Sequence, residues 1–264
     1  MSTYSEDHKK FLKRLKREKI IITVFQILIV VLFLVFWQLL GNYKLINTFL
    51  SSSPKRVIET IGKLLVDGSL YKHISITLYE VFLSFLISVA IGLIVATILW
   101  SKPILSKILD PYLTILNSLP KVALGPLIII WVGASMNSII FMSLMISTFI
   151  TIINIYNGFI STDKSYITLL RSLKASKAQI FMKVILPSNY KNIISALKIN
   201  VSMNLIGVIM GELLVSKSGL GYLIMYGSQV FNIDLVITSV VILGIISYLM
   251  YFIIYKFEIR KDKY

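Results

Sequence analysis

The sequence predicts an all-α integral membrane protein with six transmembrane helices. Of its 264 residues, 56% are hydrophobic and only 15% are charged, whereas a soluble domain has about 25% charged residues. Four apolar stretches contain no charged residue and are long enough to cross a hydrocarbon core of about 30 Å. Two further stretches are apolar but are interrupted by prolines or polar residues. The six spans are expected at about 20–40, 79–100, 112–132, 138–160, 193–215 and 235–256.

The N-terminus and the distribution of charge indicate the topology. Residues 1–19 form a basic tail, and the transmembrane domain occupies 20–264. The apolar run after the tail lacks an Ala-x-Ala-like cleavage site, so we interpret it as a retained helix rather than a removed signal peptide. With the N-terminus inside, the inner segments hold 20 Lys and Arg residues against 6 in the outer segments. The positive-inside rule therefore predicts cytoplasmic termini, and the net charge of +15 indicates topology rather than nucleic-acid binding.

A short amphipathic helix is expected after the first span. Ser53 is a good N-cap, and Pro54 suits the first helical position. Apolar residues then recur at helical spacing until Gly68, which is a typical C-terminal stop. This helix is expected to lie on the membrane surface or on the other helices.

The third and fifth spans carry the polar residues that are candidates for lining a solute pathway. Prolines inside a span free backbone groups, which neighbouring protein or a water-lined cavity must satisfy. Ionisable residues inside spans tend to face a bundle interior or a pathway. A second interpretation stays open, in which the asparagines form interhelix hydrogen bonds and the charged residues lie near the membrane interfaces. The candidates are Asn117, Pro120, Lys121, Asn200, Asn204 and Glu212.

Several kinds of chemistry are excluded by what the sequence lacks. There is no cysteine, the two histidines are far apart, and no metal-binding motif is present. The segment GELLVSKS (211–218) resembles a phosphate-binding loop, but it has Ser216 in place of the second glycine and does not follow a strand. We therefore expect no catalytic, cofactor or metal site in this chain, and no enzyme activity. If transport is driven by ATP, a partner hydrolyses it.

Residues 161–190 predict a cytoplasmic loop of two short helices between the fourth and fifth spans. The first helix is expected to end at a break at Lys174 and Ala175. Ser176 begins the second helix, and Gln179 completes a Ser-x-x-Gln capping box with it. Pro187 is expected to force Leu186 out of the helical conformation and to end this helix. The loop is basic and exposes apolar residues, so it suits either anionic lipid or a protein partner.

The loop resembles the EAA loop of ABC importer permeases, whose pattern is E-A-A-x3-G-x9-I-x-L-P. In this chain Thr168-Leu169-Leu170 take the E-A-A positions, Lys174 takes the glycine position, and Val184 takes the isoleucine position before Leu186-Pro187. LPKVALGPLIIIWVG (119–133), NIYNG (154–158) and GELLVSKSGLGYLI (211–224) are similar to other segments of the nitrate/sulfonate/taurine group of these permeases. The resemblance runs from about Pro54 to the C-terminus.

The resemblance implies the six-helix transmembrane domain of a type I ABC importer with a cytoplasmic coupling loop. Two such permease subunits, here expected as a homodimer, form the pore in a bacterial inner membrane. Two ATPase subunits dock on the loops, and an extracytoplasmic solute-binding protein delivers the solute. An autonomous secondary transporter or channel is the alternative. The docking residues implied are Thr168, Leu169, Leu170, Arg171, Ser172, Leu173, Lys174, Ala175, Ser176, Gln179 and Pro187.

Overall fold

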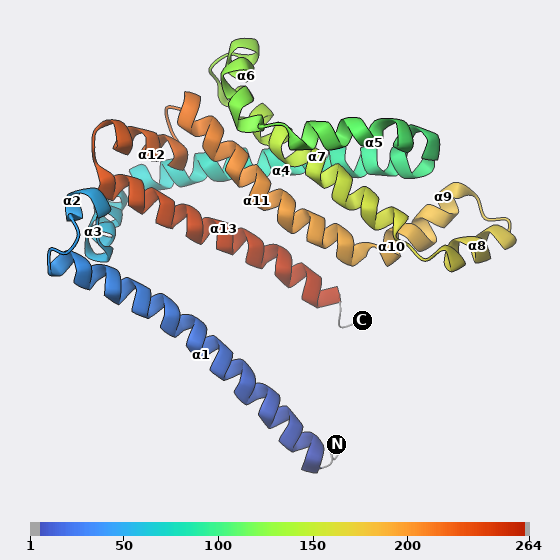
Figure 1. Ribbon diagram of the computed structural model, residues 1–264, viewed down its shortest axis with the longest axis horizontal. Coiled ribbons are helices and arrows are strands. Elements are labelled where there is room, and N and C mark those ends of the chain that lie inside the picture. Colours follow the sequence, from blue (N-terminus) through green and yellow to red (C-terminus); the bar gives the residue numbers. More distant parts are fainter. Residues whose placement is uncertain (1–5, 262–264) are drawn as a thin grey trace.

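The computed structural model describes residues 6–261, and every regular element in that range is a helix (Figure 1). Five helices are long and apolar enough to cross a membrane, and each overlaps a predicted span. The all-α membrane fold is thereby confirmed. These helices are α1 (Glu6–Asn42), α4 (Ser69–Ser101), α7 (Met136–Ile160), α11 (Tyr190–Val215) and α13 (Ile233–Lys261).

The remaining predicted span is a bent pair of helices. α5 (Pro103–Ser118) meets the segment made by η1 (Lys121–Leu124) and α6 (Gly125–Val132) at 80°. The break falls at Leu119, which has extended backbone, as expected for a residue before a proline. The helical part begins well before the predicted start of this span at 112. Counted as one span, the pair brings the number of spans in the described residues to six.

Helix α1 stands apart from the other long helices (Figure 1). None of its most apolar 18-residue window is buried, and it contacts α3 (Pro54–Val66) near its own C-terminal end. The helix begins at Glu6, so most of the segment expected as a tail is helical. Residues 1–5 of that tail lie outside the described residues.

Helix α3 follows the short helix α2 (Thr48–Ser51) and forms as the sequence predicts. The Ser53 hydroxyl accepts a hydrogen bond from Arg56 N at 3.4 Å, and Pro54 occupies the first turn. Gly68, just after the helix, has a φ of +69°, a conformation that favours glycine. Arg56 also forms a 2.6 Å ion pair with Asp234, which fastens α3 to α13.

Helices α4, α7 and α11 form the packed centre of the chain. Gly207 and Gly211 of α11 lie against α7, where an added Cβ would stand 2.4 Å from Ser143 Cα and 2.8 Å from Ile139 Cα. Such close approach of backbones needs small residues, as is usual between membrane helices.

The two ends of the bundle carry different short elements (Figure 1). At one end, called here the loop end, lie α8 (Lys164–Ser172), α9 (Lys177–Ile180), the π-helix η2 (Phe181–Ile185) and α10 (Leu186–Ser188). At the opposite end, the α12 end, lie α2, α3 and α12 (Leu220–Gln229). The predicted two-helix loop is α8 to α10.

Candidate coupling loop and transport pathway

Helix α8 begins at a well-formed cap. Asp163 accepts a hydrogen bond from Ser165 N at 2.8 Å, and this bond holds the pKa of the Asp163 carboxyl below its ordinary value. The hydroxyl of Thr168 donates to Lys164 O at 2.9 Å, and that of Ser172 donates to Thr168 O at 3.1 Å. The hydroxyl donors of both side chains are therefore satisfied within the helix.

The apolar residues of α8 divide between two faces. Ile167 and Leu170 point toward the bundle and pack against the buried cluster that contains Phe159. Leu169 and Leu173 are 59% and 69% exposed. Among the leucines expected to dock on a partner, Leu170 packs against the bundle, while Leu169 and Leu173 are exposed.

The turn between the two helices is a Schellman motif with a lysine at its left-handed position. Lys174 has a φ of +54°. Its N–H donates to Arg171 O at 2.9 Å, and Ala175 N donates to Leu170 O at 3.0 Å. The resemblance to the EAA loop places Lys174 where glycine is usual, and the backbone at Lys174 has the left-handed conformation that favours glycine. A side chain there costs about 1 kcal/mol relative to glycine.

The second helix starts with the predicted capping box. Gln179 N donates to the Ser176 hydroxyl at 3.3 Å, and Ser176 N donates to Gln179 Oε1 at 2.8 Å. Both backbone donors are thus satisfied at a solvent-facing turn. The turn and the cap together leave only a short, stiff connection between α8 and α9.

The prediction that Pro187 ends this helix is wrong. Leu186 keeps helical backbone (φ −63°, ψ −47°), and Pro187 lies inside α10. The π-helix before it contains the bond from Leu186 N to Phe181 O, which widens the helix where a proline ring would otherwise clash with the preceding turn. The chain then passes through Asn189 directly into α11.

The loop is fastened to two spans by an aromatic cluster. The ring of Phe181 lies 5.2 Å from that of Trp100 on α4 and 5.4 Å from that of Phe159 on α7. Asn189 Nδ2 also donates to Thr162 Oγ1 at 2.6 Å, and both side chains are buried. The residues that follow α8 in the loop therefore contact α4 and α7 directly and lead into α11, so a movement of the loop can be transmitted to these three helices.

Asn200 and Asn204 belong to a buried polar network, and each has an exposed fraction of 0%. Asn200 Nδ2 donates to Thr151 Oγ1 at 2.6 Å and to Ser88 Oγ at 3.0 Å. Asn204 Oδ1 accepts from Ser143 Oγ at 2.8 Å, so the network joins α4, α7 and α11. These are the interhelix hydrogen bonds of the second interpretation, and a place for these asparagines on a pathway stays a prediction.

Glu212 is also fully buried, at the α12 end. Its carboxyl accepts from Thr77 Oγ1 at 2.6 Å and from Gly221 N at 2.5 Å. Beside it, Gly219 N donates to His73 Nδ1 at 3.0 Å. These contacts, called here the Glu212 network, hold the start of α12 against α4. The pathway role expected for Glu212 likewise stays a prediction.

The sequence analysis did not identify the residues of α4 that contact Asn200, Asn204 and Glu212. A stripe of small and polar residues marks the face of α4 that packs inside the bundle, and its members recur at helical spacing. Small residues at that spacing are typical of close contacts between membrane helices, so this signal was available. The stripe consists of Thr77, Ser84, Ser88, Gly92 and Ala96.

The other pathway candidates lie together at the bend between α5 and η1. Lys121 Nζ donates to Asn117 Oδ1 at 3.2 Å and to Ile146 O at 3.4 Å, and it stands 5.5 Å from the centre of the Phe149 ring. Lys121 and Asn117 are half-buried, and Pro120 is exposed. This bend is the part of the predicted pathway that reaches the surface of the chain.

Comparison with known proteins gives consistent results. Residues 88–260 match the family model described as binding-protein-dependent transport system inner membrane component. A probable ABC transporter permease protein from Haemophilus influenzae is 32% identical over 86% of this chain and 91% of its own length. The putative aliphatic sulfonates transport permease protein SsuC from Bacillus subtilis is 28% identical over 80% of this chain and 76% of its own.

A structural comparison agrees with the sequence comparisons. The MetNI methionine ABC transporter in an inward-facing conformation contains a chain that superposes with a TM-score of 0.65. That chain is 23% identical, and the match covers 75% of this chain and 96% of the other. The superposed part of the chain thus has the fold of an ABC importer transmembrane component.

Proposed function

The chain belongs to the family of binding-protein-dependent transport system inner membrane components and is a permease subunit of an ABC importer, and from that premise we propose that α8 to α10 couple it to a cytoplasmic ATPase. The observation that carries the proposal is the contrast between the two sides of this loop. One side is fastened to α4 and α7 through Phe181, and the other leaves Leu169 and Leu173 exposed.

The loop suits the transmission of movement because it is short and capped. The Schellman turn and the capping box fix the angle between α8 and α9. When the ATPase subunits close on ATP, a load on α8 passes through the Phe181 cluster to α4 and α7. The spans then rock as a body, and access to the pathway changes sides.

A second copy of the chain fits the exposed break in the third span. Non-helical backbone at membrane depth is tolerated only where protein buries it or where it lines a water-filled cavity. In the single chain the break at Leu119 and Pro120 is exposed. We propose that a second copy covers this face and that the pathway runs between the two copies past Asn117, Pro120 and Lys121.

The proposed orientation follows from charge. If the loop end is inside, the inner segments hold 20 Lys and Arg residues against 6 in the outer segments, and this excess favours the cytoplasm for the loop end. Both termini are then cytoplasmic, the α12 end faces outward, and an extracytoplasmic solute-binding protein delivers solute there. A bacterial inner membrane is the setting that the family description favours.

Lys121 gives the pathway a positive charge, and relatives are named for sulfonate transport. We therefore propose a small anion such as a sulfonate as the solute. The variant Lys121→Met is expected to slow uptake of a sulfonate severalfold without changing assembly with the ATPase. Uptake equal to that of wild type would remove Lys121 from the pathway.

Co-purification tests the coupling role. Tagged wild type is expected to retain an ATPase subunit from native membranes, and Leu169→Asp with Leu173→Asp is expected to lose it, because a charge is introduced into an apolar contact. Val66→Asp, at an 89% exposed position on α3, is the matched control and is expected to retain the ATPase. If no ATPase co-purifies and reconstituted wild type still moves solute, the chain is an autonomous transporter instead.

A further inference from the structure

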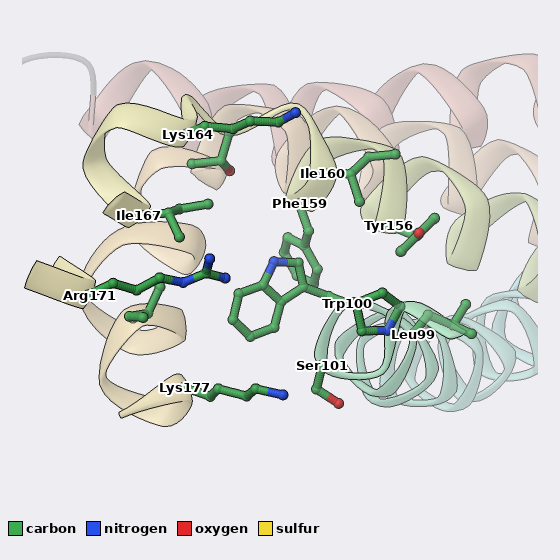
Figure 2. Close-up of a pocket in the computed structure, with 13 residues that line it drawn as sticks. Leu99, Trp100, Ser101, Tyr156, Phe159, Ile160, Lys164, Ile167, Arg171 and Lys177 are labelled. Carbon is green, nitrogen blue, oxygen red and sulfur yellow. The ribbon is translucent and has the colours of Figure 1, made fainter. Parts of the chain in front are cut away.

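A pocket of about 320 Å³ lies at the loop end, between the two-helix loop and the ends of α4 and α7 (Figure 2). Its apolar wall comes from the last residues of two spans, including Leu99, Trp100, Phe159 and Ile160. Its opposite wall is the loop, so the pocket joins the hydrocarbon level of the spans to the aqueous side. A ligand here meets apolar and polar surroundings at once.

Three cationic side chains of the loop line this pocket. Figure 2 shows Arg171 and Lys177 extending from α8 and α9 toward Trp100 and Ser101, whereas Lys164 lies at the opposite edge of the pocket and extends toward Ile160. No acidic residue lines the pocket. In the described part of the chain, none of the three forms an ion pair.

The acidic residue nearest in sequence to the three cations of the pocket does not neutralise their charge. Asp163 adjoins Lys164, but its carboxylate caps α8 by accepting from Ser165 N at 2.8 Å. It is also the only acidic residue in the segment 161–191. Three cations therefore line one pocket, with Arg171 between the two lysines and no acidic residue in the lining, which favours an external anion.

We propose that this pocket binds the phosphate group of an anionic phospholipid headgroup. Arg171 offers a planar fork that matches phosphate oxygens, and the two lysines add charge on either side. Basic pockets at the cytoplasmic ends of membrane helices are suited to anionic headgroups. Trp100 is the residue type preferred at the level of the headgroups, and the apolar wall accepts the start of the acyl chains.

The lipid source is favoured over a soluble anion by the position of the pocket. Ile104 and Ile108 on α5, close in sequence to the lining residue Pro103, are 77% and 56% exposed, as is typical of a surface that faces lipid. A bilayer thus reaches the pocket directly. The site needs only the permease chain and its membrane, so it can be tested whether or not an ATPase is bound.

The test is native mass spectrometry of the full-length chain in mild detergent titrated with phosphatidylglycerol, with phosphatidylcholine or with inorganic phosphate. Wild type is expected to bind one phosphatidylglycerol at least about tenfold more tightly than phosphatidylcholine. Lys164→Gln with Lys177→Gln is expected to lose about tenfold in affinity for phosphatidylglycerol. Lys164→Arg with Lys177→Arg is expected to keep it.

Lys107→Gln with Lys183→Gln is the matched control, because both lysines are exposed near the loop end and neither lines the pocket. It is expected to bind like wild type. Equal affinity of both glutamine pairs would show a non-specific lipid belt and overturn the proposal. Inorganic phosphate bound as tightly as phosphatidylglycerol would overturn the lipid assignment.

Retention of the ATPase, measured in the same preparations, separates this proposal from the coupling role. If the Lys164 and Lys177 glutamine pair loses the ATPase while its phosphatidylglycerol affinity is unchanged, the cations serve a protein interface and the proposal is overturned. If no preparation retains an ATPase and the lipid pattern is as expected, only the coupling role fails.

Discussion

The two ends of the bundle use their polar residues in opposite ways. At the α12 end, Glu212 and His73 accept hydrogen bonds from the backbone near α12, and Glu212 is fully buried. At the loop end, the cations and the leucines Leu169 and Leu173 are exposed. One end is closed on itself and stabilises the chain. The other end exposes a surface that a partner can bind. Variants at the α12 end should therefore lose stability, whereas variants at the loop end should lose function.

The largest effect on stability is expected at the closed end. Glu212→Ala removes the acceptor of Thr77 and Gly221, which leaves two buried donors without partners. Unfolding in detergent is expected to become easier by about 3 kcal/mol. Lys217→Ala, at an exposed position near the same end, is the control and should change little. Equal unfolding midpoints for the two variants would contradict the role given to the Glu212 network.

A smaller loss of stability, with a specific loss of function, is expected where the loop meets the spans. Phe181→Ala removes the ring that contacts Trp100 and Phe159 and should destabilise the chain by about 2 kcal/mol, since Phe181 is only partly buried. The ATPase should stay bound and hydrolyse ATP while solute uptake in proteoliposomes falls.

The neighbouring residue provides the control for this uncoupling. Met182 is 62% exposed, so Met182→Ala should leave uptake and stability unchanged. Uptake that falls equally in both variants would indicate a general disturbance of the loop rather than a broken connection.

A gain in stability is expected at the turn of the loop. Lys174→Gly should relieve the left-handed strain and raise the free energy of unfolding by about 1 kcal/mol. The same substitution at Lys183, which is helical, should lower it by a similar amount, about 1 kcal/mol. Weaker retention of the ATPase by Lys174→Gly would show that the lysine side chain itself takes part in docking.

The smallest effect is expected at the cap of α8, and it depends on pH. The hydrogen bond from Ser165 lowers the pKa of Asp163 in the folded chain, so the stabilisation is present above the unfolded pKa and is lost as the pH falls through the folded pKa. Hydrogen exchange of the first turn of α8 should be faster in Asp163→Ala than in wild type at neutral pH, and the difference should shrink in acid. Asp163→Asn should keep the cap at every pH.

Local signals in the sequence predicted the local structure well. The Ser53 cap, the capping box at Ser176 and the break at Lys174 and Ala175 depend on a few adjacent residues, and all three are observed. The prediction at Pro187 failed because a π-turn absorbs the proline, and no local rule indicated that wider turn.

The direction in which the polar residues inside the spans point was harder to predict. Apolar residues occur around the whole circumference of the fifth span, between its polar residues, so its sequence does not show which side meets a neighbour and which meets a pathway. Asn200, Asn204 and Glu212 face α4 and α7 because the small residues of those helices allow close approach. That packing depends on three segments distant in the sequence.

The most direct test of the coupling role is a distance measurement in the assembled transporter. The chain has no cysteine, so spin labels can be placed at Lys183→Cys in the loop and at Ile94→Cys on α4, both exposed. On ATP trapping, the distance within one copy should stay narrow and unchanged, while the distance between the Lys183 labels of the two copies should change. A distance between the loop label and the α4 label that shifts or broadens with ATP would contradict the rigid connection between the loop and α4 that the coupling role requires.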